Sequence, residues 1–228
     1  MSLRVASYNI HRAIGRDGRE DMGRIGDVLA ELDADLVALQ EVGYERGTSG
    51  NALEHLGGRL NMRVIEGVTL QDERGHYGNA VLSRVPVSAV SRHDISVPRR
   101  EPRGALELTV ERGGADILIV ATHLGLLPGE RRYQIRKLLS LFDASPAQVK
   151  ILLGDLNEWF LWGRPLRWLR REFGRAPAPR TFPAHRPWFA LDRLWVKPLT
   201  AVNSLRAHDS AMARVASDHL PLLAELDL

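Results

Sequence analysis

Apolar runs of two kinds alternate along the chain. Short runs that end in polar residues predict buried strands, and segments in which apolar residues recur every three or four positions predict amphipathic helices. Glu54, three residues after Asn51, has the spacing of a capping box that opens one of these helices. The outer strands are predicted at 3–10, 36–39, 149–153 and 191–196, and the helical faces lie within 22–32, 51–60, 128–142 and 162–173.

The middle of the chain has a different pattern, with short strands separated by turn residues. Gly113-Gly114 predicts a hairpin turn between two of these strands. Strand–helix units on either side of antiparallel hairpins predict an α/β fold of two packed mixed sheets with helices outside. No linker or change of composition divides the sequence, so we expect a single domain over residues 1–228. The central strands are predicted at 64–68, 79–82, 87–90, 105–110 and 116–121.

Polar side chains follow the strand at 149–153. That strand stops at Gly154 and is followed by Asp155 and Asn157. Residues two apart on an extended backbone point to the same side, so the sequence predicts that this acid and this amide face one point. The carboxyl ends of strands are also where open α/β sheets place their ligands. A polar turn after a core strand is the alternative interpretation of this stretch alone.

Other apolar runs end in the same way. Asp192 differs, because it lies within an apolar strand, where an unpaired acid costs several kcal/mol and a histidine is the usual partner. Taken singly, each residue has a simpler explanation, such as a buried structural histidine at His123, a helix cap at Asp218 or a surface acid at Glu41. Their joint occurrence at strand ends favours one shared site. The polar groups are Asn9/His11, Gln40/Glu41, His123, Asp155/Asn157 and Asp218/His219.

The composition restricts the chemistry of such a site. The chain has no cysteine, which excludes disulfides, thiolate catalysis and cysteine-bound zinc or iron–sulfur centres. A metal would be held by oxygen or imidazole ligands, which favours Mg²⁺ or Mn²⁺. The net charge of +3 and the pI of about 9.6 come mainly from arginine. Arginine binds phosphate well, but this excess alone does not establish a nucleic-acid partner.

The location of the protein follows from what the sequence lacks. The first predicted strand begins at residue 3, which leaves no room for a signal peptide, and no apolar run has membrane-spanning length. We therefore expect a cytoplasmic protein without a transmembrane segment. The sequence does not indicate the oligomeric state.

Seven motifs, in this order, resemble those of the endonuclease/exonuclease/phosphatase superfamily, whose fold is that of deoxyribonuclease I. The resemblance spans nearly the whole chain and implies a four-layered α/β sandwich that cleaves phosphoesters with a divalent metal. The motifs are Tyr-Asn-Ile-His at 8–11, Leu-Gln-Glu-Val at 39–42, Tyr-Gly-Asn-Ala-Val-Leu-Ser-Arg at 77–84, Thr-His-Leu at 122–124, Gly-Asp-Leu-Asn at 154–157, Leu-Asp-Arg-Leu at 191–194 and Ser-Asp-His at 217–219.

The resemblance implies a metal site at the first two motifs. Glu41 would ligate the metal with Asn9 beside it, and Asp218 would help to hold the metal or its water. Several relatives carry a carboxylate two residues after the first asparagine, whereas this chain has His11. We therefore expect one Mg²⁺, or Mn²⁺ in its place.

The resemblance also implies the roles of the remaining site residues. Asp155 would orient or deprotonate the attacking water, and Asn157 would hold a phosphate oxygen. His219 would act as a general base or as a donor to the phosphoryl group, with its tautomer fixed by Asp192. His123 would stabilise charge on the transferring phosphate. Such chemistry needs a metal to neutralise the anionic ester, a base for water, and fixed donors for the transition state.

The substrate is less clearly indicated than the reaction. Asn79 and Arg103 correspond to positions where relatives contact phosphate, and the segment 159–180 is rich in tryptophan and arginine. This segment is either a helix that packs on the core or a basic lip that contacts a nucleic-acid backbone or phospholipid headgroups, with a membrane surface as one option. The residues of the predicted lip are Arg164, Arg167, Trp168 and Arg171, opposite an apolar face of Trp162, Leu166, Leu169 and Phe173.

Three functions therefore remain open. The first is a phosphodiesterase that acts on nucleic acid or phospholipid, the second is a phosphomonoesterase of the lipid or inositol phosphate type, and the third is a binding protein that has lost catalysis. The complete set of polar residues argues against the third, and the short chain leaves little room for the DNA-wedging loops of abasic-site nucleases. A serine hydrolase is excluded because no nucleophile-elbow motif is present.

Overall fold

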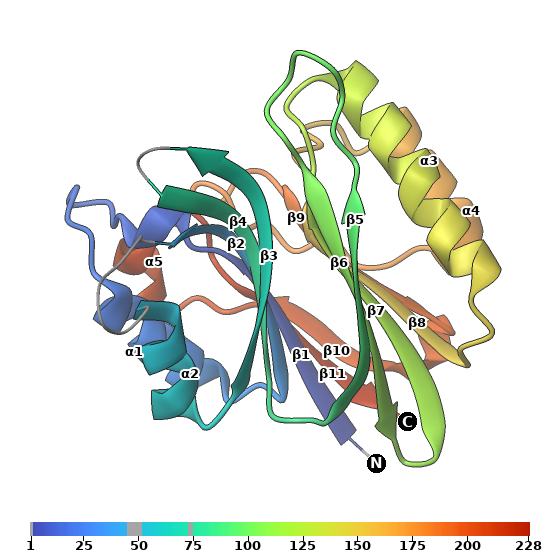
Figure 1. The fold of residues 1–228 in the computed structure, drawn as a ribbon, viewed down its shortest axis with the longest axis horizontal. Coiled ribbons are helices and arrows are strands. Elements are labelled where there is room, and N and C mark those ends of the chain that lie inside the picture. Colours follow the sequence, from blue (N-terminus) through green and yellow to red (C-terminus); the bar gives the residue numbers. More distant parts are fainter. Residues whose placement is uncertain (1, 45–51, 73–74) are drawn as a thin grey trace.

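Two mixed β-sheets pack face to face, and helices cover the outer side of each (Figure 1). The structure is a computed structural model that describes residues 2–44, 52–72 and 75–228. The predicted α/β sandwich of four layers is confirmed. The predicted capping residue Asn51 lies outside the described residues.

The first sheet has six strands in the order β10-β11-β1-β2-β4-β3. Its strands β1 and β2 are parallel, and its other neighbouring pairs are antiparallel. The helices α1, α2 and α5 lie on its outer face (Figure 1). The strands of this sheet are β1 (Ser2–Asn9), β2 (Leu36–Tyr44), β3 (Arg63–Asp72), β4 (Gly75–Ser83), β10 (Val202–Ala207) and β11 (Leu222–Asp227), and its helices are α1 (Met22–Leu32), α2 (Ala52–Leu60) and α5 (Ala213–Ala216).

The second sheet has five strands in the order β5-β6-β7-β8-β9, with β7 and β8 parallel. The helices α3 and α4 lie against its outer face (Figure 1). Two short 3₁₀ helices, η1 (His11–Ala13) and η2 (Leu199–Ala201), follow β1 and β9. The elements of this half are β5 (Val87–Asp94), β6 (Gly104–Arg112), β7 (Ala115–His123), β8 (Val149–Asp155), β9 (Asp192–Lys197), α3 (Pro128–Ala144) and α4 (Arg164–Phe173).

Three apolar clusters hold these four layers together. The central cluster fills the space between the sheets, and the outer clusters join each sheet to its helices. The side chains of a strand alternate between the two faces of its sheet. In β1, Leu3 and Val5 point to the other sheet, while Ala6 and Tyr8 belong to the cluster on the helix side. Because each sheet is covered on both faces, many of its strands consist of nearly continuous apolar runs.

Several predicted element boundaries are confirmed, and others need correction. The strand predicted at 36–39 continues to Tyr44, because a bulge after Leu39 lets β2 resume its pairing with β4 at Val42. Trp162 does not belong to the buried face of its helix, since α4 begins at Arg164 and Trp162 is 72% exposed. Strand β10 was not predicted, because its mixed residues have no clear apolar alternation.

Gly154 allows β7 and β8 to approach each other next to the polar residues that follow both strands. Its φ of +141° is unfavourable for other residues, and a Cβ there would lie 1.8 Å from the carbonyl oxygen of Thr122. We expect Gly154→Ala to lower the free energy of unfolding by more than about 3 kcal/mol, or to prevent folding, because strain and a backbone clash add. Urea unfolding followed by circular dichroism would measure this loss.

Gly58 provides the matched control. It lies exposed in α2, and a Cβ at this position has no neighbour within 4 Å. Gly58→Ala should therefore raise stability by up to about 1 kcal/mol, as expected for an alanine in a helix. Equal stability of Gly154→Ala and the wild type would contradict the role given to Gly154.

Candidate functional site

Strand ends from both sheets meet at one end of the sandwich. Asn9, His123 and Asp155 are the last residues of β1, β7 and β8, and Asp192 is the first residue of the antiparallel neighbour β9. Since β1 packs against β8 across the interface between the sheets, their polar ends lie side by side. Both chain termini lie at the opposite end (Figure 1). The topology therefore brings together residues that are distant in the sequence.

Asp155 lies at the centre of this group. Its Oδ2 accepts a hydrogen bond of 3.1 Å from the amide nitrogen of Asn9. The Nε2 atoms of His123 and His219 lie 3.5 Å and 3.8 Å from the same oxygen. Asp155 is 1% exposed, so one buried carboxylate oxygen faces donors from both sheets.

Asn157 reaches the site through a turn and not through the alternation of a strand. Strand β8 ends at Asp155, and the φ of Asn157 is +49°. The backbone N–H of Asn157 donates to Asp155 Oδ1 at 2.9 Å, which closes an Asx turn. Its Nδ2 donates to the carbonyl of Leu124 at 3.0 Å and lies 3.0 Å from His123 Nε2. The expected convergence is present, but the extended-strand reasoning for it was wrong.

Glu41 is placed by the bulge in β2. Its φ is +58°, a conformation that non-glycine residues adopt at a cost and that occurs often at functional sites. The Nδ2 of Asn9 donates to Glu41 Oε1 at 3.1 Å as well as to Asp155, so one amide bridges two carboxylates. Tyr77 also hydrogen-bonds Glu41, and burial, together with the negative charge of Glu41, raises the pKa of its hydroxyl.

Asp192 and His219 form a buried pair. His219 Nδ1 lies 2.8 Å from Asp192 Oδ2, and the hydroxyl of Thr181 donates to the same oxygen. Burial lowers the pKa of His219, but the negative charges of Asp192, Asp155 and Asp218 outweigh it and raise the pKa to about 10. The ring therefore directs its Nδ1 proton to Asp192 and presents Nε2 to Asp155.

His123 has the opposite electrostatic environment. Burial lowers its pKa to about 3, and the positive charge of Arg103 adds to this, against the opposing effect of Asp155. The Nη1 of Arg103 lies 3.0 Å from His123 Nδ1, and since arginine can only donate, Nδ1 is the acceptor. His123 is therefore a neutral ring that turns Nδ1 towards Arg103 and Nε2 towards Asp155 and Asn157.

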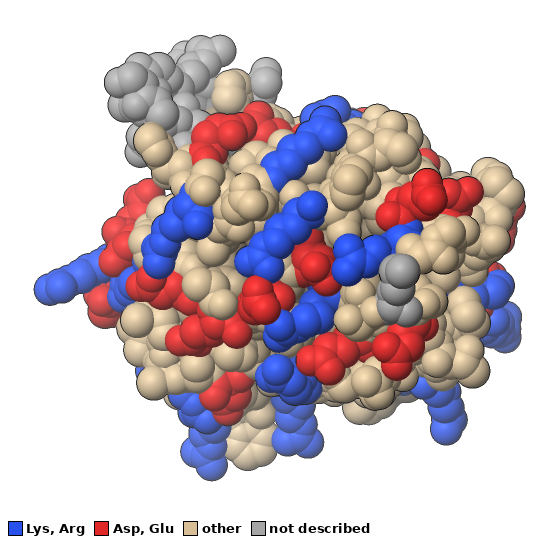
Figure 2. All heavy atoms as spheres, turned by 90° about the horizontal axis from the view of Figure 1, so that it is seen from below, with Lys and Arg blue, Asp and Glu red and all other residues tan. Residues whose placement is uncertain are grey.

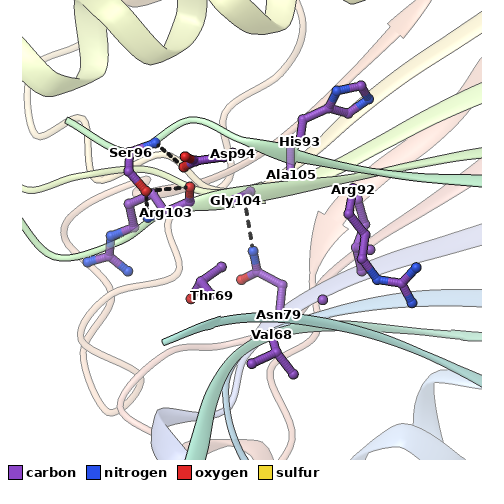
Figure 3. Close-up of a pocket in the computed structure, with 12 residues that line it drawn as sticks. Val68, Thr69, Asn79, Arg92, His93, Asp94, Ser96, Arg103, Gly104 and Ala105 are labelled. Carbon is purple, nitrogen blue, oxygen red and sulfur yellow. Dashed lines mark hydrogen bonds between the residues drawn. The ribbon is translucent and has the colours of Figure 1, made fainter. Parts of the chain in front are cut away.

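A pocket of about 230 Å³ lies beside this group, between the edges of the two sheets (Figure 3). Asn79 of β4 and Arg103 line it from opposite sides, and the Nδ2 of Asn79 donates to the carbonyl of Gly104 at 3.2 Å. Because Arg103 also contacts His123, the pocket is adjacent to the polar centre. Of the two residues expected to contact phosphate, Arg103 thus joins the pocket to the centre, and Asn79 lines the pocket.

The residues of the predicted basic lip on α4 lie in different places and do not form one surface. Arg167 is exposed, whereas Trp168 is half-buried against the core, with the guanidinium of Arg136 5.8 Å from its ring centre. Trp168 and Arg171 line a hollow between α3 and α4 with Asp143. Arg164, at the first turn, lines a different hollow next to the loop that follows Asn157. The helix is thus mainly a packing element, and only its first turn borders the site loops.

The residues present fit a divalent cation next to Glu41. Glu41 and Asp155 approach the same Asn9 amide, so two carboxylates lie close together, as a hard cation requires. Asn9 Oδ1 accepts from the backbone N–H of His11 at 3.0 Å, and Asp218 is partly exposed nearby, 3.9 Å from His11 Nδ1. Ligand atoms of Asp155, Asp192 and His219 also lie within 4.8 Å of one another. In that second group, however, the Nδ1 of His219 is already engaged in a hydrogen bond with Asp192.

Sequence reasoning missed several residues that support the site. Tyr77 lay within a quoted motif, and its aromatic hydroxyl could have been assigned as a partner of Glu41. Thr181 belongs to none of the motifs, and nothing in the sequence indicates its hydrogen bond to Asp192. The buried ion pair between Arg131 and Glu158, at 3.2 Å, joins α3 to the loop after Asn157 and was equally hidden.

Known proteins are similar to this chain in sequence or in fold. The Escherichia coli (strain K12) protein YbhP is 32% identical over 247 aligned residues, which cover 100% of this chain and 97% of YbhP. A crystal structure of an endonuclease/exonuclease/phosphatase from Beutenbergia cavernae matches with a TM-score of 0.79 and 25% identity, over 100% of this chain and 72% of that one. The structure of TDP2 from D. rerio with a single-strand DNA product matches with a TM-score of 0.74 and 18% identity, over 100% and 99% of the two chains.

The described helices include none that is long and apolar enough to cross a membrane.

The family comparison covers the whole site. Residues 6–219 match the Endonuclease/Exonuclease/phosphatase family, a range that contains every strand end described above. The chain belongs to the endonuclease/exonuclease/phosphatase family.

Proposed function

We propose that this protein is a divalent-metal-dependent hydrolase of phosphodiesters. The observation that carries the proposal is the position of Asp155, whose single Oδ2 faces Asn9, His123 and His219 in a buried centre. An acceptor surrounded by donors can orient a water molecule while the donors bind the oxygens of an anionic ester. Membership of the family and the likeness to TDP2, a structure that contains a DNA product, support this chemistry.

Glu41 is the proposed metal ligand, with Asn9 and Asp218 beside it. The Asn9 Oδ1 accepts one hydrogen bond from the His11 backbone and keeps a second lone pair for a ligand, and Glu41 is partly open. When bound, Mg²⁺ or Mn²⁺ would neutralise negative charge on the phosphoester and polarise its bonds. Tyr77 and Asn9 fix the orientation of the Glu41 carboxylate through their hydrogen bonds.

The other residues divide the remaining tasks. Asp155 orients the attacking water and accepts its proton. The Nε2 atoms of His123 and His219 lie on the same side of Asp155, where they donate to phosphoryl oxygens. Asp192 holds the His219 tautomer by accepting from Nδ1. Asn157 contributes its amide next to His123, at a position from which it contacts a phosphate oxygen.

A diester is favoured over a monoester by the pocket beside the centre. A phosphodiester carries a second organic group, and the space between Asn79 and Arg103 is large enough to receive part of it. The guanidinium of Arg103 can in addition attract the phosphate, because its contact with His123 holds its positive charge next to the polar centre. The substrate class that we propose is a nucleic-acid backbone or a phospholipid headgroup.

Hydrolysis of two soluble esters tests this proposal. Bis(p-nitrophenyl) phosphate should be cleaved in Mn²⁺ or Mg²⁺ with a kcat/KM at least about tenfold above that for p-nitrophenyl phosphate, because only the diester uses the pocket. EDTA should abolish both reactions. The opposite order of the two esters would favour the phosphomonoesterase, and metal binding without any hydrolysis would favour a binding protein.

A further inference from the structure

Two loops that leave the site carry exposed apolar side chains at their tips. One loop follows His123 and the other follows Asn157, and in each the apolar tip begins three residues later. Each tip is therefore within about 10 Å of chain length from a site residue. Single exposed apolar residues are ordinary, but groups of large exposed apolar side chains often mark an interaction surface. The members of this apolar rim are Leu126 at 62% exposure, Leu127 at 42%, Phe160 at 55%, Leu161 at 51% and Trp162 at 72%.

A buried arginine holds the two loops in these positions. Arg131 of α3 is 2% exposed, and its Nε donates to Glu158 Oε2 at 3.2 Å. The Nη1 of the same guanidinium donates to the carbonyl of Leu126. The first loop is fixed further by Glu130 Oε2, which accepts from the backbone N–H of Leu127 at 2.8 Å. Because a buried ion pair joins the loops, their apolar tips are displayed in a fixed arrangement.

Arginines without acidic partners surround the rim. Arg132 and Arg164 share a hollow with Phe160 and Trp162, and Arg99 and Arg100 share a hollow with the two leucines of the rim. Within the described parts of the chain, none of these four arginines has a carboxylate within ion-pair distance. The neighbouring acids are already engaged, since Glu101 pairs with Arg103 and Glu158 with Arg131.

The opposite end of the molecule has a different charge pattern. Figure 2 shows that end, where acidic and basic side chains are interspersed. Arg4 and Arg84 both pair there with Asp33, at 3.0 Å and 2.7 Å. Solvated surfaces are usually of this mixed kind. Uncompensated cations next to exposed aromatic and aliphatic groups therefore distinguish the site end, and this combination suits an anionic surface with an apolar interior.

We propose that the apolar rim and its four arginines dock onto an anionic phospholipid bilayer. The rim enters the boundary between headgroups and acyl chains, and the arginines contact lipid phosphates. This inference rests on the proposed phosphodiester hydrolysis and names its substrate class as a membrane phospholipid. Docking in this orientation brings the phosphodiester of a lipid headgroup to Asp155, because the rim loops begin at His123 and Asn157.

Vesicle binding tests the proposal independently of catalysis. The full chain is sedimented in EDTA with vesicles of phosphatidylglycerol and phosphatidylcholine, or of phosphatidylcholine alone. Wild type should bind the anionic vesicles at least about tenfold more tightly than the neutral ones, and binding should weaken with salt. The variant Leu126→Ser/Phe160→Ser/Trp162→Ser should bind the anionic vesicles at least about tenfold more weakly, since the removed side chains supply the apolar contact.

Further variants separate the two contributions and control for location. Arg99→Gln/Arg132→Gln should weaken binding and reduce its salt dependence. Arg63→Gln/Leu199→Ser changes an exposed arginine and an exposed leucine at the far ends of β3 and β9, and it should bind as wild type does. Wild type that does not prefer anionic vesicles, an unaffected rim variant, or an equal loss in the control would overturn the proposal.

Hydrolysis of the soluble diester separates this inference from the proposed function. The triple rim variant should retain wild-type kcat/KM on bis(p-nitrophenyl) phosphate, because that molecule does not require a membrane. Cleavage of the soluble diester without vesicle binding would contradict the proposed membrane docking and leave the proposed hydrolase in place. Vesicle binding without metal-dependent cleavage would contradict the proposed hydrolase and leave the docking surface in place.

Discussion

His219→Ala is expected to lower kcat for the diester by about 10³-fold, within the range usual for a catalytic acid, base or donor. Asp192→Asn should lower it nearly as much, and the double variant should be no worse than His219→Ala. The reason is that Asp192 acts through His219, whose Nδ1 lies 2.8 Å from Asp192 Oδ2. Residues that act as one unit lose their effect together and not additively. Steady-state kinetics of the four proteins would measure this coupling.

Stability measurements keep this comparison interpretable. Asp192 is fully buried and also accepts from Thr181, so Asp192→Asn alters a packed region. Thr181→Val removes that second hydrogen bond and keeps the histidine contact, so it should change kcat much less than Asp192→Asn does. Losses for Asp192→Asn and His219→Ala that multiply in the double variant would show that the two residues do not form a catalytic pair.

Glu41→Gln is expected to remove nearly all metal-dependent hydrolysis while the fold is retained. The side chain is only partly buried and keeps its shape, so unfolding should change by less than about 1 kcal/mol. The lost carboxylate should weaken Mn²⁺ binding by at least about tenfold, since an amide oxygen is a poorer ligand for a hard cation. Calorimetric titration with Mn²⁺ and the rate of diester cleavage are the two measurements.

Glu66→Gln is the corresponding control. Glu66 lies on β3, pairs with Ala80 of β4, and is partly exposed like Glu41, but it has no place in the proposed site. This control should bind Mn²⁺ and hydrolyse the diester as wild type does. Normal metal dependence in Glu41→Gln would mean that the metal is held elsewhere, with the group Asp155, Asp192 and His219 as the alternative.

Much of the fold is predictable because apolar spacing reflects burial. The stripe in segment 22–32 is buried in α1 almost without exception, and the Gly113-Gly114 turn joins β6 to β7 as expected. The failures occur where burial does not follow the local pattern. Strand β10 is half-exposed, so its residues show no alternation, and β2 passes through a bulge that the sequence cannot display.

The site was predicted less completely, for a related reason. Polar residues at strand ends could be noticed because each interrupts an apolar run, and their joint occurrence indicated one site. What the sequence could not show is how turns aim them, as in Asn157, whose positive φ directs its side chain to His123. Supports such as Thr181 come from irregular segments, where no periodicity marks a residue as buried. The apolar rim was missed as well: Trp162 was assigned to a helical face, although its helix begins only at Arg164, and the other four rim residues received no assignment.

The central claim is that Asp155 organises metal-dependent hydrolysis of a phosphodiester. The most direct test is the rate of bis(p-nitrophenyl) phosphate cleavage in saturating Mn²⁺ by wild type and by Asp155→Asn, with the folding of both proteins verified. The substitution keeps the size of the side chain but removes the proton acceptor that faces Asn9, His123 and His219. We expect kcat to fall by at least about 10³-fold. A rate for Asp155→Asn within tenfold of wild type, or no metal-dependent cleavage by the wild type, would contradict the account.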